Sequence, residues 1–502
     1  MAALDDILNS GSPVQQAPWP RILVDETRWQ EAAQQLARGR LVLLGLWGER
    51  AAVHMALLDE ERGQVAIVSI GAASGRFPSV AAVHPPALRL ERAIQDLFGL
   101  EPEGLPDRRS WLDHGVWGVA APLGRSGSSA PTGRYAFLPS EGESLHQIPV
   151  GPVHAGIIEP GHFRFTANGE TVVRLEERLG YVHKGIESLM QGAELAHGAK
   201  LAGRVSGDSS VAYALGFARA AEAALGIEPP ARAVWLRALM AELERLANHF
   251  GDIGAICNDA AFALMHAHCG VLRERVLRAA DIAFGHRLMR DVILPGGLAR
   301  DLGTEGISAI VALIAEARRR FPALVELYDG TASLQDRTVG TGILRPELAV
   351  QFGAGGYVGR ASGRRFDARL KPGYPPYDRL RFAVPVRAEG DVNARVWIRI
   401  DEVEQSLYLV EQIVAGLPAG AVLSTARPAH ASGEGASLSE GFRGDILVWL
   451  RLGEDGRIAR CHLRDPSWFQ WPLLEAAIEG NIVADFPLCN KSFNCSYSGH
   501  DL

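Results

Sequence analysis

The densest group of side chains that could do chemistry lies in GPVHAGIIEPGHFRF, residues 151–165. It contains Glu159 and His162, and His183 follows in YVHKGIESLM, four residues before Glu187. Carboxyl and imidazole groups can exchange protons near neutral pH when burial or neighbouring charges shift their pKa values. We therefore regard Glu159, His162 and His183 as candidate catalytic residues. The alternative is that they hold together a buried polar network.

The apolar neighbours of Glu159 in IIEPGHF predict that its carboxylate is desolvated. Desolvation would raise its pKa, unless His162 or Arg164 compensates. His183 and Glu187, spaced by four residues, would share one face if this stretch were helical. Glu159 and His162 come directly before a predicted β-hairpin, so they would lie on a turn and at a strand start. A rigid scaffold can present a site at such positions.

Metal-binding side chains gather at the C-terminal end, in DFPLCNKSFNCSYSGHDL. Cys489, Cys495 and His500 are soft or borderline ligands, but their spacing is C-x5-C-x4-H, without a C-x2-C pair or an evident fourth ligand. Whether they bind a metal therefore stays open. The sequence GAGGYVGR lacks the spacing of a dinucleotide-binding loop, and no phosphate-binding loop or nucleophile elbow occurs.

The elements that must position these residues fall into two parts, which together predict an α+β fold. Residues 1–124 alternate short apolar runs with polar breaks and end in a helical pattern over LRLERAIQDLFGL, which indicates a small α+β domain. Residues 125–149 are rich in Gly, Ser and Pro, as in a linker.

From residue 150 the pattern predicts a mostly helical domain that continues to residue 502. It would begin with a β-hairpin whose turn is Asn168-Gly169. Ala- and Leu-rich helices are expected over 205–227, 231–250, 258–285 and 305–327, with a final helix from about Asp401.

Composition restricts the class of protein. The 502 residues carry a formal net charge of −7, and 47% are hydrophobic, which is typical of a globular chain and offers no general attraction for nucleic acid. Five cysteines cannot form a disulfide framework, so a reducing compartment is expected. The N-terminus is not typical of a signal peptide, and no apolar run would span a membrane. We expect a cytoplasmic chain that reaches a membrane only through partners.

The run from GPVHAGIIEPGHFRF to YVHKGIESLM resembles the large subunit of energy-converting, membrane-bound nickel–iron hydrogenases of the formate-hydrogenlyase type. It is similar also to the quinone-site subunit of respiratory complex I. The resemblance continues through LRPELAVQFGAGGYVGRASG and YDRLRFAVPVRAEGDVNARVWIRIDEVEQSL. Residues 91–111 resemble the signature of the small complex I partner subunit, with Leu105 where that family usually has His, so the two subunits would be fused here.

The chain departs from this family where the metal should be. The hydrogenases hold nickel and iron with two C-x-x-C pairs, which fall here on Ser206 and Ser209 and on Cys495 and Ser498. A serine hydroxyl is a hard ligand that does not ionise near neutral pH, so it does not replace a thiolate. The quinone-contacting Tyr of the complex I subunit falls on Gly207. We therefore expect a degenerate site with no metal, while Glu159 matches a proton-transfer glutamate of the hydrogenases.

The resemblance implies a hetero-oligomeric complex in which this chain passes electrons or couples redox chemistry to ion translocation. Its partners would be an iron–sulfur small subunit and antiporter-like membrane subunits, and it would lie peripherally on the cytoplasmic face of the inner membrane. No cofactor is expected on the chain itself. Because the sequence has no cluster-binding motif, the iron–sulfur cluster would belong to a partner. A quinone is the expected electron acceptor. The alternative is a non-catalytic scaffold that bridges the soluble and membrane subunits.

Overall fold

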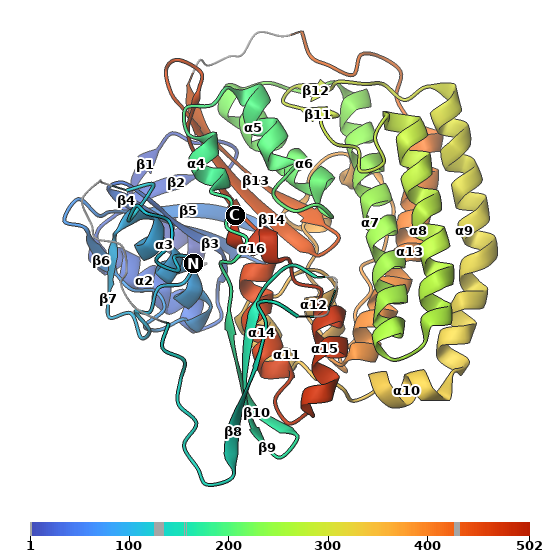
Figure 1. Ribbon diagram of the computed structural model, residues 1–502. Helices are drawn as coiled ribbons and strands as arrows, with labels where there is room; N and C mark the ends of the chain where they lie inside the picture. The colour runs from blue at the N-terminus through green and yellow to red at the C-terminus, as the bar shows by residue number, and fades with distance from the viewer. Residues whose placement is uncertain (1–2, 125–134, 155, 157, 426–431) are drawn as a thin grey trace.

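The computed structural model describes residues 3–124, 135–154, 156, 158–425 and 432–502. It has an N-terminal domain built on a sheet and a larger body of long helices, with a second sheet between them (Figure 1). Within the described residues, no helix combines the length and the apolar character that crossing a membrane requires. The predicted α+β class is therefore confirmed.

The N-terminal domain is a five-stranded sheet of order β1-β2-β5-β4-β3, packed with three helices. Within this sheet, β2 and β5 pair in parallel and the other neighbours are antiparallel. Short apolar runs of this part form the strands β3 to β5, and α3 is followed by Gly99 in the left-handed conformation that favours glycine. The elements are α1 (Ala3–Leu8), β1 (Ser12–Val14), β2 (Arg21–Val24), α2 (Glu26–Ala37), β3 (Val42–Glu49), β4 (Ala52–Asp59), β5 (Gln64–Gly71), β6 (Arg76–Pro78), α3 (Leu88–Phe98) and β7 (Glu101–Glu103).

A three-stranded antiparallel sheet follows, made of β8 (Leu145–Val150), β9 (His162–Asn168) and β10 (Thr171–Arg178). The hairpin expected at Asn168-Gly169 is confirmed, since Asn168 pairs with Thr171 across the turn. The expected linker 125–149 overlaps β8, where Ile148 pairs with Phe165. Residues 125–134 of that linker lie outside the described part of the chain.

The helical body is formed by five long helices, of which α7 packs against both α8 and α13. They are α6 (Ser210–Leu225), α7 (Ala231–Asp259), α8 (Ala263–Phe284), α9 (Thr304–Gly330) and α13 (Val392–Gly416). The helix expected from Asp401 begins earlier, because the Asp391 carboxylate accepts the backbone N–H of Ala394 at 2.7 Å and caps it. The shorter elements are α4 (Ile186–Met190), α5 (Leu195–Ala202), β11 (Ile293–Leu294), β12 (Gly297–Leu298), α10 (Ala332–Thr338), α11 (Pro346–Gln351) and α12 (Gly356–Ala361).

The expectation that α13 is the final helix is wrong. A sheet of order β13-β14-β15 and three helices come after it. These are β13 (Gly433–Gly441), β14 (Gly444–Leu452), β15 (Ile458–Arg464), α14 (Ser467–Ala477), α15 (Phe486–Phe493) and α16 (Tyr497–Asp501). The strands of this sheet are buried along nearly their whole length, so they lack the alternation that marks a half-exposed strand.

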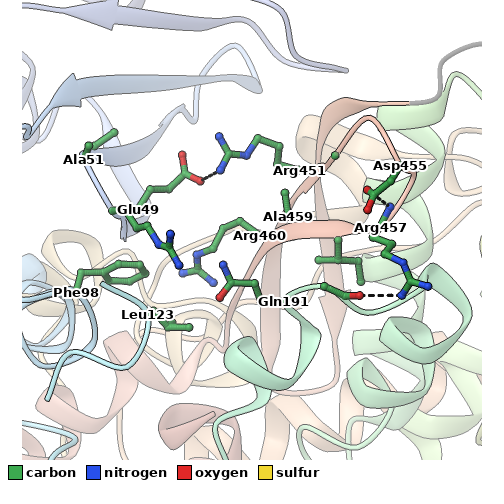
Figure 2. A pocket seen from close by; sticks show the side chains of 15 residues that line it. Glu49, Ala51, Phe98, Leu123, Gln191, Arg451, Asp455, Arg457, Ala459 and Arg460 are labelled. Atoms are coloured by element: carbon green, nitrogen blue, oxygen red, sulfur yellow. Dashed lines mark hydrogen bonds and ion pairs between the residues drawn. The ribbon is translucent and has the colours of Figure 1, made fainter. Parts of the chain in front are cut away.

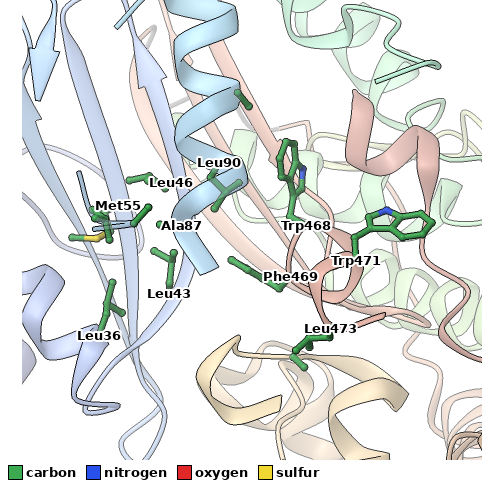
Figure 3. Close-up of a cluster of buried hydrophobic side chains, with 14 of the residues drawn as sticks. Leu36, Leu43, Leu46, Met55, Ala87, Leu90, Trp468, Phe469, Trp471 and Leu473 are labelled. Atoms are coloured by element: carbon green, nitrogen blue, oxygen red, sulfur yellow. The ribbon is translucent and has the colours of Figure 1, made fainter. Parts of the chain in front are cut away.

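The N-terminal domain and the larger body share one hydrophobic core. Met55 of the N-terminal sheet and Leu90 of α3 belong to the same buried cluster as Trp468 and Phe469 of α14 (Figure 3). Burial of apolar surface contributes roughly 25 cal/mol per Å², so a core that spans both parts ties them together. The fused domain is therefore fixed relative to the C-terminal helices.

One ion pair reinforces the same boundary beside a cavity of about 690 Å³ (Figure 2), and a second lies within the larger body. Arg451 of β14 contacts the Glu49 carboxylate of β3 at 2.6 Å, and Arg460 of β15 contacts Glu187 of α4 at 2.8 Å. Burial opposes ionisation of Glu187, but Arg460 and His462 lower its pKa to about 2. This carboxylate is therefore ionised and anchors β15 to α4 at neutral pH.

Candidate functional site

The turn between α5 and α6 brings Ser206 and Ser209 to the C-terminal segment 494–502. The Ser206 hydroxyl lies 3.0 Å from that of Ser496, although 290 positions separate the two residues in the sequence. Ser496 stands between Cys495 and Ser498, which are also buried. The four degenerate ligand positions thus meet in one region of the fold.

An aspartate and an arginine fill the centre of this region. Arg443, from the turn between β13 and β14, contacts Asp208 with Nη2 to Oδ2 at 2.5 Å and donates to the Ser209 hydroxyl at 3.2 Å. The Ser206 hydroxyl donates to the Asp208 carboxylate at 2.8 Å. Burial would raise the pKa of Asp208, but the charge and hydrogen bonds of Arg443 and the bond from Ser206 lower it to about 2. The centre is therefore an ionised, hydrogen-bonded pair.

These residues do not fit a nickel–iron centre. Two of the four positions carry hydroxyls already engaged with Asp208, whose charge Arg443 balances. Cys495 is the one sulfur among these four positions, so at most one soft thiolate ligand is offered where the nickel–iron centre needs four. Among the described residues, no three His, Cys, Asp or Glu side chains converge as metal ligands, so Cys489, Cys495 and His500 form no such cluster.

His500 and Cys489 have other surroundings. The His500 ring accepts from the Trp111 indole N–H at 3.1 Å and contacts the Asp501 carboxylate through Nδ1 at 2.9 Å, so both nitrogens are engaged. Burial raises the pKa of the Cys489 thiol to about 11. Both side chains therefore pack in the core that joins the N-terminal domain to the body.

Glu159 reaches the same region from the loop before β9. Its Oε2 accepts the backbone N–H of Ser498 at 3.1 Å, so it lies beside the second pair of degenerate positions. The residue is exposed, and the expectation that its apolar neighbours desolvate it is wrong. Its neighbour Ile158 is itself exposed and does not cover the carboxylate.

The two candidate histidines lie apart from the Asp208–Arg443 pair. His162 is buried, which lowers its pKa, and both of its ring nitrogens are engaged: Nδ1 with the Gly151 carbonyl at 2.9 Å and Nε2 with Arg164 at 3.3 Å. His183 contacts the Asp501 carbonyl at 2.7 Å. It precedes α4, so the expectation that it shares a helix face with Glu187 is wrong.

Sequence reasoning missed Asp208 and Arg443. Asp208 lies between the two serines and could have been considered, but Arg443 is 235 residues away with no motif around it. A cavity of about 360 Å³ adjoins Asp208 and is also lined by Asp252, Lys491, Arg273 and His266. The arrangement is suited to holding fixed charge beside this polar cavity.

Comparison with known proteins gives two family matches. The family described as "Respiratory-chain NADH dehydrogenase, 30 Kd subunit" matches residues 22–129, and the one described as "Respiratory-chain NADH dehydrogenase, 49 Kd subunit" matches residues 259–432. Formate hydrogenlyase subunit 5 of Escherichia coli (strain K12) is 32% identical over 448 residues, which cover 86% of this chain and 78% of that protein.

Relatives with quinone-reductase names are also found. An NADH-quinone oxidoreductase subunit of Dehalococcoides mccartyi is 31% identical over 67% of this chain and 92% of its own length. The C/D subunit of NADH-quinone oxidoreductase from Bacteroides thetaiotaomicron is 26% identical over 87% of this chain and 85% of its own. The similarity to the last protein extends across both the N-terminal domain and the larger body.

Proposed function

Because the chain belongs to the family of hydrogenase large subunits and NADH-quinone oxidoreductase C/D subunits, we propose that it works in a membrane-attached oxidoreductase complex without a nickel–iron centre. By its similarity to these proteins, the chain is a large subunit of a complex I- or hydrogenase-related oxidoreductase. The observation that carries the rest is the Asp208–Arg443 ion pair at the position where thiolates would hold the metal.

In this proposal the chain supplies a docking surface and charged groups, while electrons come from an iron–sulfur cluster of a partner subunit. The acceptor is a quinone or another small molecule. The cavity beside Asp208 supports a role in charge handling, because Asp252 and Lys491 line it and contact each other at 3.2 Å. Ionised groups fixed in this way can stabilise charge that develops on a bound acceptor.

The remaining partners are antiporter-like membrane subunits, and the complex lies on the cytoplasmic face of the inner membrane. A relative named membrane-bound hydrogenase subunit alpha, from Pyrococcus furiosus, is 29% identical over 69% of this chain, and its name supports attachment to a membrane. A complex of this kind would couple electron transfer to ion translocation.

A non-catalytic scaffold is the second candidate function. The scaffold role is favoured because the polar groups at the centre already have partners: Ser206, Ser209 and Arg443 all contact Asp208. In that case the chain only bridges the iron–sulfur and membrane subunits.

The substitution Glu159→Gln distinguishes the two candidates. An amide oxygen can still accept the Ser498 N–H, so we expect the complex to assemble, but the amide cannot exchange a proton. Turnover should fall at least tenfold, about 1.4 kcal/mol of barrier. The measurement is electron transfer from reduced methyl viologen to a water-soluble quinone by the complex purified through a tag on this chain.

Glu170→Gln, at an exposed position in the β9–β10 turn, is the matched control and should leave turnover unchanged. The subunits that copurify with each variant are identified by mass spectrometry. Wild-type turnover in an assembled Glu159→Gln complex would support the scaffold function. It would also eliminate the proton-transfer role that the resemblance implies for Glu159.

A further inference from the structure

A third cavity, of about 870 Å³, is lined by the segments 109–115 and 135–137 and by side chains of the β8–β10 sheet. Three arginines line it, Arg109, Arg164 and Arg178, against one carboxylate, that of Asp113. Arg109 is balanced by Asp107 at 2.6 Å and Glu176 at 2.5 Å, both outside the lining. The net charge of the cavity therefore depends on Arg164 and Arg178.

Arg178 is a buried cation without an acidic partner. It is 3% exposed, donates to the carbonyl oxygens of Trp111 and Asp113, and leaves its Nε without a hydrogen-bond partner. Across the described residues no carboxylate pairs with it, and residues 125–134, which precede the lining residue Tyr135, contain no Asp or Glu. A buried charge is normally paired, because its desolvation is unfavourable. Arg178 therefore lacks a counterion.

Arg164 is held in place by uncharged groups. Its Nε donates to the His162 Nε2 at 3.3 Å and its Nη1 donates to the Gln147 side-chain oxygen at 3.2 Å. Since the His162 Nδ1 faces the Gly151 carbonyl at 2.9 Å, its Nε2 lone pair is free to accept from Arg164. His162 is thus a positioning residue for a guanidinium that has no carboxylate partner in the described chain.

Aromatic rings fix the arginines without neutralising them. Arg164 lies over the Phe137 ring at 4.4 Å, and Arg178 lies over Tyr135 at 4.5 Å. Such contacts stabilise a cation through the quadrupole of the ring, but they add no negative charge. The guanidiniums are therefore preorganised for an anion.

We propose that this cavity binds a phosphate-bearing anion through Arg164 and Arg178. A planar guanidinium matches the oxygens of phosphate with paired hydrogen bonds, and the two guanidiniums supply positive charge that balances the anion. The cavity exceeds the size of a bare phosphate, so it has room for a ligand with an organic group attached to the phosphate. The cavity near β14 differs, because its Arg451 and Arg460 are already paired with Glu49 and Glu187.

A soluble phosphate ester and a phospholipid headgroup share this chemistry, and the experiment separates them. The full chain, in its complex, is titrated with glycerol 3-phosphate by calorimetry at constant ionic strength. In a second arm it is sedimented with vesicles of phosphatidylcholine containing phosphatidylglycerol, with pure phosphatidylcholine as the blank. Arg164→Gln should weaken binding at least tenfold, and Arg50→Gln, in the cavity near β14, should leave it unchanged.

Binding that is sensitive to Arg164→Gln in either arm supports the site, and the arm in which it occurs identifies the source of the phosphate. Arg178→Lys, which keeps the charge and loses the planar fork, is the second variant and should weaken binding in the same arm. Absence of binding in both arms, or equal binding by wild type and both variants, would overturn the proposal.

Discussion

At the scale of single residues, serine at the former ligand positions changes what Asp208 can do. Its carboxylate accepts hydrogen bonds from Ser206 and Ser209 and pairs with Arg443, which is 3% exposed. The Asp208 side chain is 34% exposed, so the group that depends on the pair is the buried Arg443 guanidinium, whose charge would stay uncompensated without Asp208.

We predict that Asp208→Asn lowers the free energy of unfolding by about 2 kcal/mol, because the Arg443 guanidinium then stays buried without its counterion. The check is denaturant-induced unfolding of wild type and variant. Asp291→Asn is the matched control: its partner Arg204 is 43% exposed, so the loss should stay below about 0.5 kcal/mol. Equal losses in the two variants would contradict the role of Asp208.

The sequence predicted part of this centre. The register of the resemblance identified Ser206, Ser209, Cys495 and Ser498, and the fold brings them together. Arg443 could not be found, because its pairing with Asp208 depends on where β13 and β14 turn. The exposure of Glu159 was missed because apolar neighbours in sequence do not show whether a loop is covered.

At the scale of elements, the β13–β15 sheet sets the position of α6. This helix begins at Ser210, directly after the site. Glycine permits the close packing of α6 on β13: a Cβ at Gly435 would lie 1.9 Å from the Ala220 carbonyl oxygen. The helices α6 to α9 could be predicted from periodicity. The sheet could not, since its strands are buried on both faces.

We predict that Gly435→Ala destabilises the chain by about 3 kcal/mol, because the added methyl group must push α6 away from β13. Gly270→Ala in α8 meets no atom within 4 Å and should be neutral or stabilising by up to about 1 kcal/mol. Both are measured by denaturant unfolding. A Gly435→Ala variant as stable as Gly270→Ala would show that α6 and β13 do not pack as described.

At the scale of the whole molecule, the N-terminal domain is joined to the body by more than its chain connection. The hydrophobic cluster runs from Met55 to Trp468, and Arg89 of α3 contacts Glu177 and Glu475 of the body at 3.1 and 2.7 Å. Composition predicts a division into two parts joined by a linker. The shared core was not predictable, because nothing in one segment's periodicity says which other segment covers it.

The Gly-, Ser- and Pro-rich composition of residues 125–134 predicts that limited proteolysis cleaves there first. Because the two parts share a core, we predict that the fragments stay associated and elute together in size-exclusion chromatography. They should separate only in denaturant. Fragments that separate in native buffer, or first cleavage inside α6 to α8, would contradict this arrangement.

The most direct test of the account is the nickel content of the complex purified from cells grown with nickel. The site offers the hydroxyls of Ser206, Ser209 and Ser498, a protonated Cys495 and the Asp208–Arg443 pair. We predict that elemental analysis finds less than about 0.1 nickel per chain and that the complex takes up no hydrogen. About one nickel per chain, retained after chelation and lost in Cys495→Ser, would contradict the account.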